Sequence, residues 1–159
     1  MNRKLKGILG LLITGFLLVG NMNVFAAENA FIKIPQTETK VVYSSNNTST
    51  TLSNPVLTAC NIGIGITNSG LSITLDTTAS HVANEIGVKN LILQEKTLFG
   101  WKDITIGNDC TYNSDIYSGG YIYTLAKEGT TYRVKCTHYA KFGGTELTLD
   151  NTSSELKYN

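Results

Sequence analysis

The feature that most constrains the fold is a hydrophobic period of two residues that begins at Leu57. From Cys60 to Ile66 every second residue is apolar, and the residues between are polar or small. Such alternation places one set of side chains on each face of a β-strand. The 3.6-residue period of an amphipathic helix does not occur after residue 26. The pattern therefore predicts an all-β domain.

Turn residues divide this domain into about seven short strands. The predicted strands are 57–66, 71–75, 86–95, 101–106, 121–125, 131–139 and 145–150. Turn sequences at 67–70, 97–100 and 143–144 are expected to join neighbouring strands into hairpins. Strands at this spacing, without helices, are typical of a β-sandwich.

The first 26 residues have the composition of a secretory signal peptide. Arg3, Lys4 and Lys6 precede an apolar run, which small residues close near Ala26. That run is too short for a lasting anchor, and no other stretch reaches the roughly 18 apolar residues of a membrane span. We therefore expect a secreted, extracellular protein whose mature form has no membrane span.

Two further segments follow the signal. Residues 27–56 are expected to form a tether, because 44–54 are almost entirely Ser, Thr and Asn and bury too little apolar surface to offset their ordering entropy. The short apolar patch at 31–35 either adds an edge strand or stays mobile. Residues 57–159 form the predicted β-sandwich domain.

Charge and length restrict the class of function. Three of the 13 Lys and Arg residues lie in the signal segment, which leaves 10 basic against 12 acidic residues after position 26. They are scattered singly, whereas a nucleic-acid-binding protein concentrates Lys and Arg on one face. The sequence therefore predicts a single domain and argues against nucleic acid as a partner.

Three cysteines, Cys60, Cys110 and Cys136, are expected in an oxidising compartment. Alternation places Cys60 and Cys136 on the core-facing sides of their strands, whereas Cys110 lies in a polar stretch. The predicted pairing is one disulfide between Cys60 and Cys136. The spare thiol of Cys110 either links two copies of the chain or stays reduced.

The segment 125–136, Leu-Ala-Lys-Glu-Gly-Thr-Thr-Tyr-Arg-Val-Lys-Cys, resembles the approach to the sixth strand of fibronectin type III and immunoglobulin-like domains. In those domains a corner tyrosine bonds back to the backbone at the crossover between the sheets. The resemblance assigns this role to Tyr132, although Leu125 lies one residue further from it than is usual. Tyr139 has the opposite parity and is expected to face solvent. The expected fold is an immunoglobulin-like or fibronectin-III-like β-sandwich.

Most of the domain, residues 57–158, also resembles an uncharacterised family of small secreted proteins from Gram-positive bacteria. The features that carry this resemblance are Gln94, Gly100-Trp101, Tyr132-Arg133-Val134, His138 and Gly143 to Glu146. The resemblance implies a fold and brings no known activity.

The sequence contains no recognisable catalytic motif. His81 and Glu85 have the spacing of helical metal ligands but lie in a β context, and a third ligand is missing. His138 is expected to end the core as a hydrogen-bonded residue rather than to act as a base. The Asp and Asn residues between 103 and 115 suit calcium but fit turn chemistry better. We therefore expect neither an enzyme nor a cofactor.

Aromatic residues are the better functional candidates. Phe99, Trp101, Tyr112 and Tyr117 are predicted to form a binding surface, with Trp101 beside a hairpin tip. Exposed Trp and Tyr side chains anchor protein partners or stack on sugar rings. The predicted function is a non-enzymatic extracellular module that binds a protein. The alternatives are a carbohydrate-binding module that uses Trp101 and nearby tyrosines, and a secreted toxin or inhibitor. The alternative to a binding role for Trp101 is that its side chain only covers one end of the sandwich.

Overall fold

The computed structural model describes residues 30–35, 48–49 and 56–159, which form strands and turns without a helix. The prediction of an all-β domain is therefore confirmed. The expected signal peptide lies outside the described residues, as does most of the expected tether.

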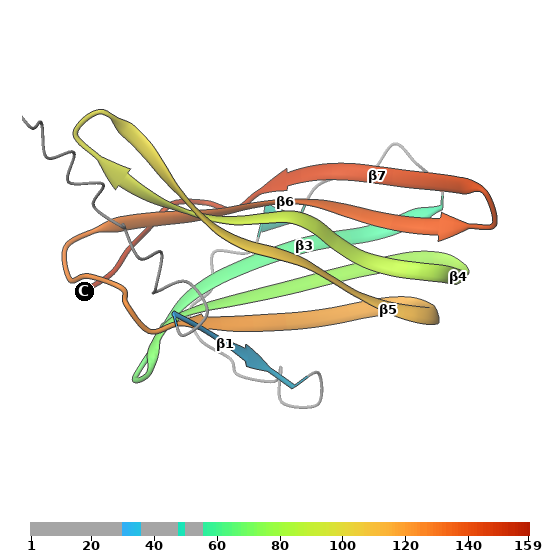
Figure 1. Cartoon of the computed structure of the whole chain (residues 1–159), viewed down its shortest axis with the longest axis horizontal. Helices are drawn as coiled ribbons and strands as arrows, with labels where there is room; N and C mark the ends of the chain where they lie inside the picture. The colour runs from blue at the N-terminus through green and yellow to red at the C-terminus, as the bar shows by residue number, and fades with distance from the viewer. Residues whose placement is uncertain (1–29, 36–47, 50–55) are drawn as a thin grey trace, which may run out of the picture.

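The described residues contain eight strands, which pair in one antiparallel network (Figure 1). They are β1 (Phe31–Ile34), β2 (Thr48–Ser49), β3 (Leu57–Thr67), β4 (Gly70–Thr97), β5 (Gly100–Tyr123), β6 (Thr131–Phe142), β7 (Thr145–Thr152) and β8 (Leu156–Lys157). The two longest, β4 with 28 residues and β5 with 24, form a single long hairpin.

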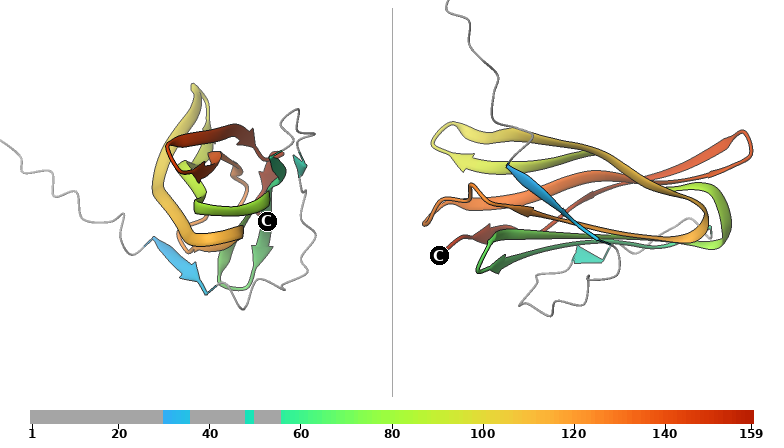
Figure 2. Two further views of the ribbon diagram at one scale, coloured as in Figure 1. Left: turned by 90° about the vertical axis from the view of Figure 1, so that its right-hand side faces the viewer. Right: turned by 60° about the horizontal axis from the view of Figure 1, so that its bottom comes forward.

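The β4–β5 hairpin bends and contributes to both layers of the sandwich. In the first layer, residues 71–79 of β4 lie between β3 and the second half of β5, and β1 adds to the free side of β5. In the second, residues 85–95 of β4 lie between the first half of β5 and β6, and β7 follows β6. When the molecule is viewed along its longest axis, the strands of the two layers surround a common interior (Figure 2, left).

This pairing reproduces the strand order of an immunoglobulin-like sandwich. Such domains place strands A, B and E in one sheet and C, F and G in the other, with C′ beside C in some members. Here β3 corresponds to A, the two halves of β4 to B and C, the two halves of β5 to C′ and E, and β6 and β7 to F and G. The predicted β-sandwich is confirmed.

The number and length of the strands differ from the sequence prediction. Residues 71–75 and 86–95, expected as two strands, belong to the single strand β4, and β5 likewise joins 101–106 to 121–123. The β4–β5 register shifts between Thr78 and Ala83, and Asn113 has a φ of 53° in the facing part of β5. The hairpin therefore passes between layers through irregular strand rather than through loops.

The core lies between the layers, and in β3, the first part of β4 and β6 it holds most of the residues that alternation assigned to it. Fully buried side chains include Ile62, Ile64, Leu71, Ile73, Leu75, Ile86, Leu91 and Leu93. The core also contains a polar contact between the two layers: the Thr77 hydroxyl lies 2.7 Å from Nδ1 of the buried His138. His138 is thus a hydrogen-bonded core residue, as expected, and burial lowers its pKa to about 4.

Tyr132 lies near the start of β6, where the resemblance places a corner tyrosine. Its ring is fully buried, and its hydroxyl accepts a hydrogen bond of 3.0 Å from the backbone N–H of Lys127, at the approach to β6. Leu125 is instead exposed, so it is not the core leucine of the motif. The corner role that the resemblance gave to Tyr132 agrees with this geometry.

β1 lies at the edge of the first layer, where Phe31–Ile34 pair with residues 120–123 of β5. Of the two possibilities for the apolar patch at 31–35, the structure shows the edge strand. An ion pair of 2.7 Å joins Lys33 to Asp109 of the other layer. Asp109 also accepts hydrogen bonds from the hydroxyls of Tyr117 and Tyr121. This cluster ties the edge strand to both layers.

Candidate functional site

The candidate site is the tip of the hairpin that joins β4 to β5. Leu98 is 98% exposed and Phe99 is 100% exposed, so both apolar side chains project fully into solvent. Two hydrogen bonds of the Thr97 side chain close the turn beneath them. The Thr97 hydroxyl donates to the carbonyl of Gly100 at 2.9 Å and accepts a hydrogen bond from the N–H of Phe99 at 3.3 Å.

A second hairpin in the molecule has the same construction. Between β3 and β4, the Thr67 hydroxyl donates to the carbonyl of Gly70 at 2.9 Å and accepts from the N–H of Ser69 at 3.2 Å. In both hairpins a glycine with positive φ ends the turn, +136° at Gly70 and +124° at Gly100. The exposed tip of this hairpin is Asn68-Ser69. Turn geometry therefore does not require the apolar Leu98-Phe99.

Trp101 forms the base of the apolar tip. It is half-buried, and the guanidinium of Arg133 lies 4.1 Å from the centre of its ring. Arg133 is itself held by Gln94, whose amide oxygen accepts its Nε–H at 2.7 Å. Gln94 then donates to Asp103 at 2.6 Å. This ladder crosses three strands and fixes the Trp101 ring through stacking with a cation.

The four aromatic residues of the predicted binding surface do not form one surface. Tyr117 is 0% exposed and lies inside the sandwich, so its assignment to a surface is wrong. Its hydroxyl donates to Asp109 at 3.0 Å, over the backbone of Gly119. Alternation does not reveal this, because β5 passes from one layer to the other between Asp109 and Tyr117.

Tyr112 is exposed but distant from the tip. It lies eleven positions after Trp101 on the same strand, which corresponds to roughly 35 Å of extended chain. One sugar chain of a few units therefore cannot stack on both rings. Only Phe99 and Trp101 of the predicted set belong to the candidate site, and Leu98 is the residue that the sequence prediction missed.

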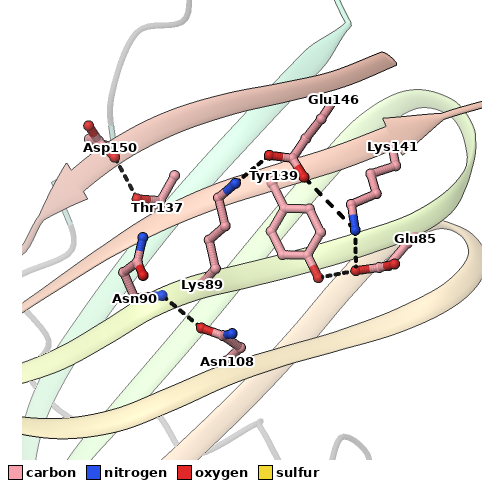
Figure 3. Close-up of polar contacts among 9 residues, drawn as sticks. All are labelled: Glu85, Lys89, Asn90, Asn108, Thr137, Tyr139, Lys141, Glu146 and Asp150. Carbon is pink, nitrogen blue, oxygen red and sulfur yellow. Dashed lines mark hydrogen bonds and ion pairs between the residues drawn. The ribbon is translucent and has the colours of Figure 1, made fainter. Parts of the chain in front are cut away.

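The outer face of the second layer holds a second polar cluster, drawn in Figure 3. Tyr139 lies there between the ammonium groups of Lys89 and Lys141, at 5.5 and 5.4 Å from its ring centre. Its hydroxyl donates to Glu85 at 2.6 Å, and Glu85 also pairs with Lys141 at 3.0 Å. Glu146 completes the cluster through ion pairs with Lys89 and Lys141.

This cluster corrects the prediction for Tyr139. The parity is right, since Tyr139 faces outward, but the side chain is buried beneath the two lysine stems. Burial and the bond to Glu85 raise the pKa of Tyr139, and the same bond, with Lys141, lowers the pKa of Glu85. The charged groups satisfy one another, so the cluster stabilises the sheet face rather than offering unpaired groups to a ligand.

The remaining sequence candidates do not assemble into a reactive site. His81 is exposed and packs against Phe142, with ring centres 4.4 Å apart. Within residues 30–35, 48–49 and 56–159 no three His, Cys, Asp or Glu side chains are grouped to hold a metal ion. Asp103 bonds Gln94, whereas Asp109 points into the sandwich, so the acidic residues of β5 are separated.

No protein-family model and no curated sequence matches the chain. Among the residues that the structure describes, no helix is long and apolar enough to cross a membrane.

Proposed function

We propose that this protein is a secreted, non-enzymatic module that binds an extracellular protein through the tip of the β4–β5 hairpin. The observation that carries the proposal is the complete exposure of Leu98 and Phe99 at the tip of the 97–100 hairpin. The 67–70 hairpin has the same turn hydrogen bonds but polar residues at the same positions. An apolar side chain that the fold does not require gains stability only when a partner buries it.

The tip offers two apolar side chains that a partner can bury. Burying a leucine and a phenylalanine is worth about 1.5–3 kcal/mol each. The Thr97 hydrogen bonds and the Trp101 base hold the hairpin in one conformation, so little ordering entropy is lost on binding. We infer a partner with an apolar pocket that receives Phe99.

Polar groups around the tip define the rim of this interface. Lys96 pairs with Glu155 at 2.9 Å, and both side chains are about half-exposed. Arg133 lies over Trp101, beside them. A rim of mixed charge complements a partner pocket that carries both signs, and it contributes specificity more than affinity.

The test compares binding by the wild type and by the double variant Leu98→Asn with Phe99→Ser, which has the tip residues of the 67–70 hairpin. Proteins captured from cell-surface extracts by the wild type are identified, purified and measured against both forms. We expect the captured protein to bind the wild type and to lose this binding in the variant. Val82→Asn, at another exposed apolar residue, is the matched control and keeps binding. Equal affinity of the tip variant contradicts the proposal.

Glycan binding is the competing outcome. A glycan array probed with the wild type and Trp101→Ala distinguishes it. Sugar-specific binding that Trp101→Ala removes and that Leu98→Asn with Phe99→Ser retains replaces the protein-partner proposal with a carbohydrate-binding module. Growth arrest of target cells, or inhibition of the captured protein, makes the module a toxin or an inhibitor. N-terminal sequencing of protein from culture medium tests secretion, with a start near Ala27 expected.

A further inference from the structure

Cys60 and Cys136 are buried on strands that belong to different layers. Cys60 is on β3, directly beside Thr77 of β4. Cys136 is two residues before His138 on the inward face of β6, and both cysteines are buried. Because Thr77 and His138 are joined across the layers at 2.7 Å, the neighbouring cysteine positions lie at the same level of the sandwich.

A second contact between the layers lies on the other side of the pair. Asn151 of β7 is the cross-strand partner of Cys136, and its buried side-chain amide donates to the backbone carbonyl of Cys60 at 3.0 Å. Cross-strand partners have Cβ atoms about 4.5–5.5 Å apart. The two cysteines are therefore enclosed by contacts that hold their backbones together.

All three cysteines are free thiols in the structure, so the disulfide predicted from the sequence is not formed there. Burial raises the pKa of both the Cys60 and the Cys136 thiol to about 12, and a charge on Cys60 further raises that of Cys136. The thiolate is the species that exchanges disulfides. The folded, reduced pair is therefore protected from oxidants by its own burial.

We propose that Cys60 and Cys136 are joined by an interlayer disulfide that forms while the chain folds, before the two layers close over the thiols. The oxidant is the disulfide form of a thiol–disulfide oxidoreductase or a small-molecule disulfide. One cysteine thiolate attacks this disulfide, forms a mixed disulfide and expels one thiolate. The second cysteine thiolate attacks the protein sulfur of the mixed disulfide and expels the other. Two protons and two electrons leave the cysteine pair, and the oxidant departs as two thiols.

The position of this bridge differs from that in antibody domains. There the interlayer disulfide joins strands B and F. In this protein the equivalent interlayer contact between B and F is the hydrogen bond of Thr77 to His138, and the cysteine pair is displaced by one strand to β3. Cys110 lies on the outer face of β5, opposite Gly87, and is not part of the pair.

The experiment counts thiols after unfolded, reduced protein refolds with or without a glutathione disulfide buffer. Alkylation in denaturant is expected to label one thiol per chain after oxidative refolding and three after reductive refolding. Peptide mapping without reduction is expected to give the link between Cys60 and Cys136. In Cys110→Ser the expected counts are zero and two. A link that involves Cys110, or three thiols after oxidative refolding, overturns the pairing.

A separate experiment tests whether the disulfide forms before the two layers close over the thiols. Reduced protein that is already folded is mixed with the same glutathione disulfide, and its oxidation is compared with that of the chain in denaturant. Because burial suppresses the thiolate, we expect the folded form to react at least about tenfold more slowly. Equal rates contradict the inference that the bridge must form before the layers close.

Discussion

The two Thr-x-x-Gly hairpins share the same turn bonds but differ in what surrounds them. The 67–70 hairpin is part of the sandwich, because Gly70 lies against the backbone of Tyr123, where an added Cβ would be 2.3 Å from the carbonyl oxygen. The 97–100 hairpin projects freely, and a Cβ added to Gly100 would meet no atom within 4 Å. Figure 1 shows both hairpins at the same end of the molecule.

This contrast separates structural from functional demands on one turn. The packed hairpin has a polar tip, Asn68-Ser69, whereas the projecting hairpin has the apolar tip Leu98-Phe99. If folding alone determined the residues, the hairpin in contact with the domain would be the one with apolar residues. The opposite distribution indicates that the apolar tip serves contact with another molecule.

The largest expected effect is the difference in unfolding free energy between Gly70→Ala and Gly100→Ala. Both replacements strain a backbone with positive φ, at roughly 1–3 kcal/mol. Only Gly70→Ala also forces a side chain into the Tyr123 backbone, so we expect a total loss of about 3 kcal/mol or more. Denaturant unfolding of both variants measures the difference. Equal losses would show that both hairpins project, and the contrast would be lost.

The next effect concerns binding to the captured partner. Leu98→Asn with Phe99→Ser is expected to weaken binding by about 2 kcal/mol or more, or roughly 30-fold, as at a buried hot spot. The reciprocal variant, Asn68→Leu with Ser69→Phe, retains the wild-type affinity because the original tip is intact. Isothermal titration measures both. A reciprocal variant that binds several-fold more tightly would mean that any apolar tip suffices and that the surroundings of Trp101 add nothing.

A smaller effect tests whether the two turns are alike. Thr67→Val and Thr97→Val each remove one hydroxyl that donates to the glycine carbonyl and accepts an amide N–H. We expect each to cost about 1 kcal/mol of unfolding free energy, and the two losses to agree within about 0.5 kcal/mol. Thermal and denaturant midpoints provide the comparison. A clearly larger loss in either variant would show that one turn relies on its hydroxyl more than the other.

The smallest effect is the stability of the tip variant itself. Leu98→Asn with Phe99→Ser changes side chains that contact solvent alone, so the free energy of unfolding should change by less than about 0.5 kcal/mol. Denaturant midpoints measured beside the wild type are sufficient. A loss above 1 kcal/mol would indicate that the apolar tip supports the fold, and it would remove the main argument for a binding role.

Local patterns predicted the features that depend on neighbouring residues. Alternation identified the core faces of β3, of residues 71–75 in β4 and of β6, and turn residues located the hairpins at 67–70 and 97–100. The resemblance at 125–136 gave Tyr132 its role. Each of these is determined within a few residues of chain, where period and turn chemistry act.

Features that depend on contacts between layers were not predictable in the same way. Thr77 and Thr78 are polar and resemble a loop, yet β4 continues through them, because Thr77 finds the buried His138. Tyr117 is buried since Asp109 of the other layer accepts its hydroxyl. Tyr139 faces outward, as its parity predicts, but it is buried beneath Lys89 of the adjacent strand β4 and Lys141 of its own strand. Thr77 and His138 are 61 residues apart, and Asp109 meets Tyr117 because β5 passes from one layer to the other between them. Alternation contains no information about such contacts.

The shared hairpin also has a consequence for how the domain folds and unfolds. Because β4 and β5 run through both layers, neither layer can detach as an independent unit, and loss of structure is expected to be a single cooperative transition. The β4–β5 ladder begins at the short-range pair Thr97 and Gly100 and ends at Leu71 and Tyr123, 52 residues apart in the chain. Closing the near pair first costs the least chain entropy. The 97–100 turn, which is proposed to recognise a partner, is therefore also where pairing of β4 with β5 is expected to begin during folding.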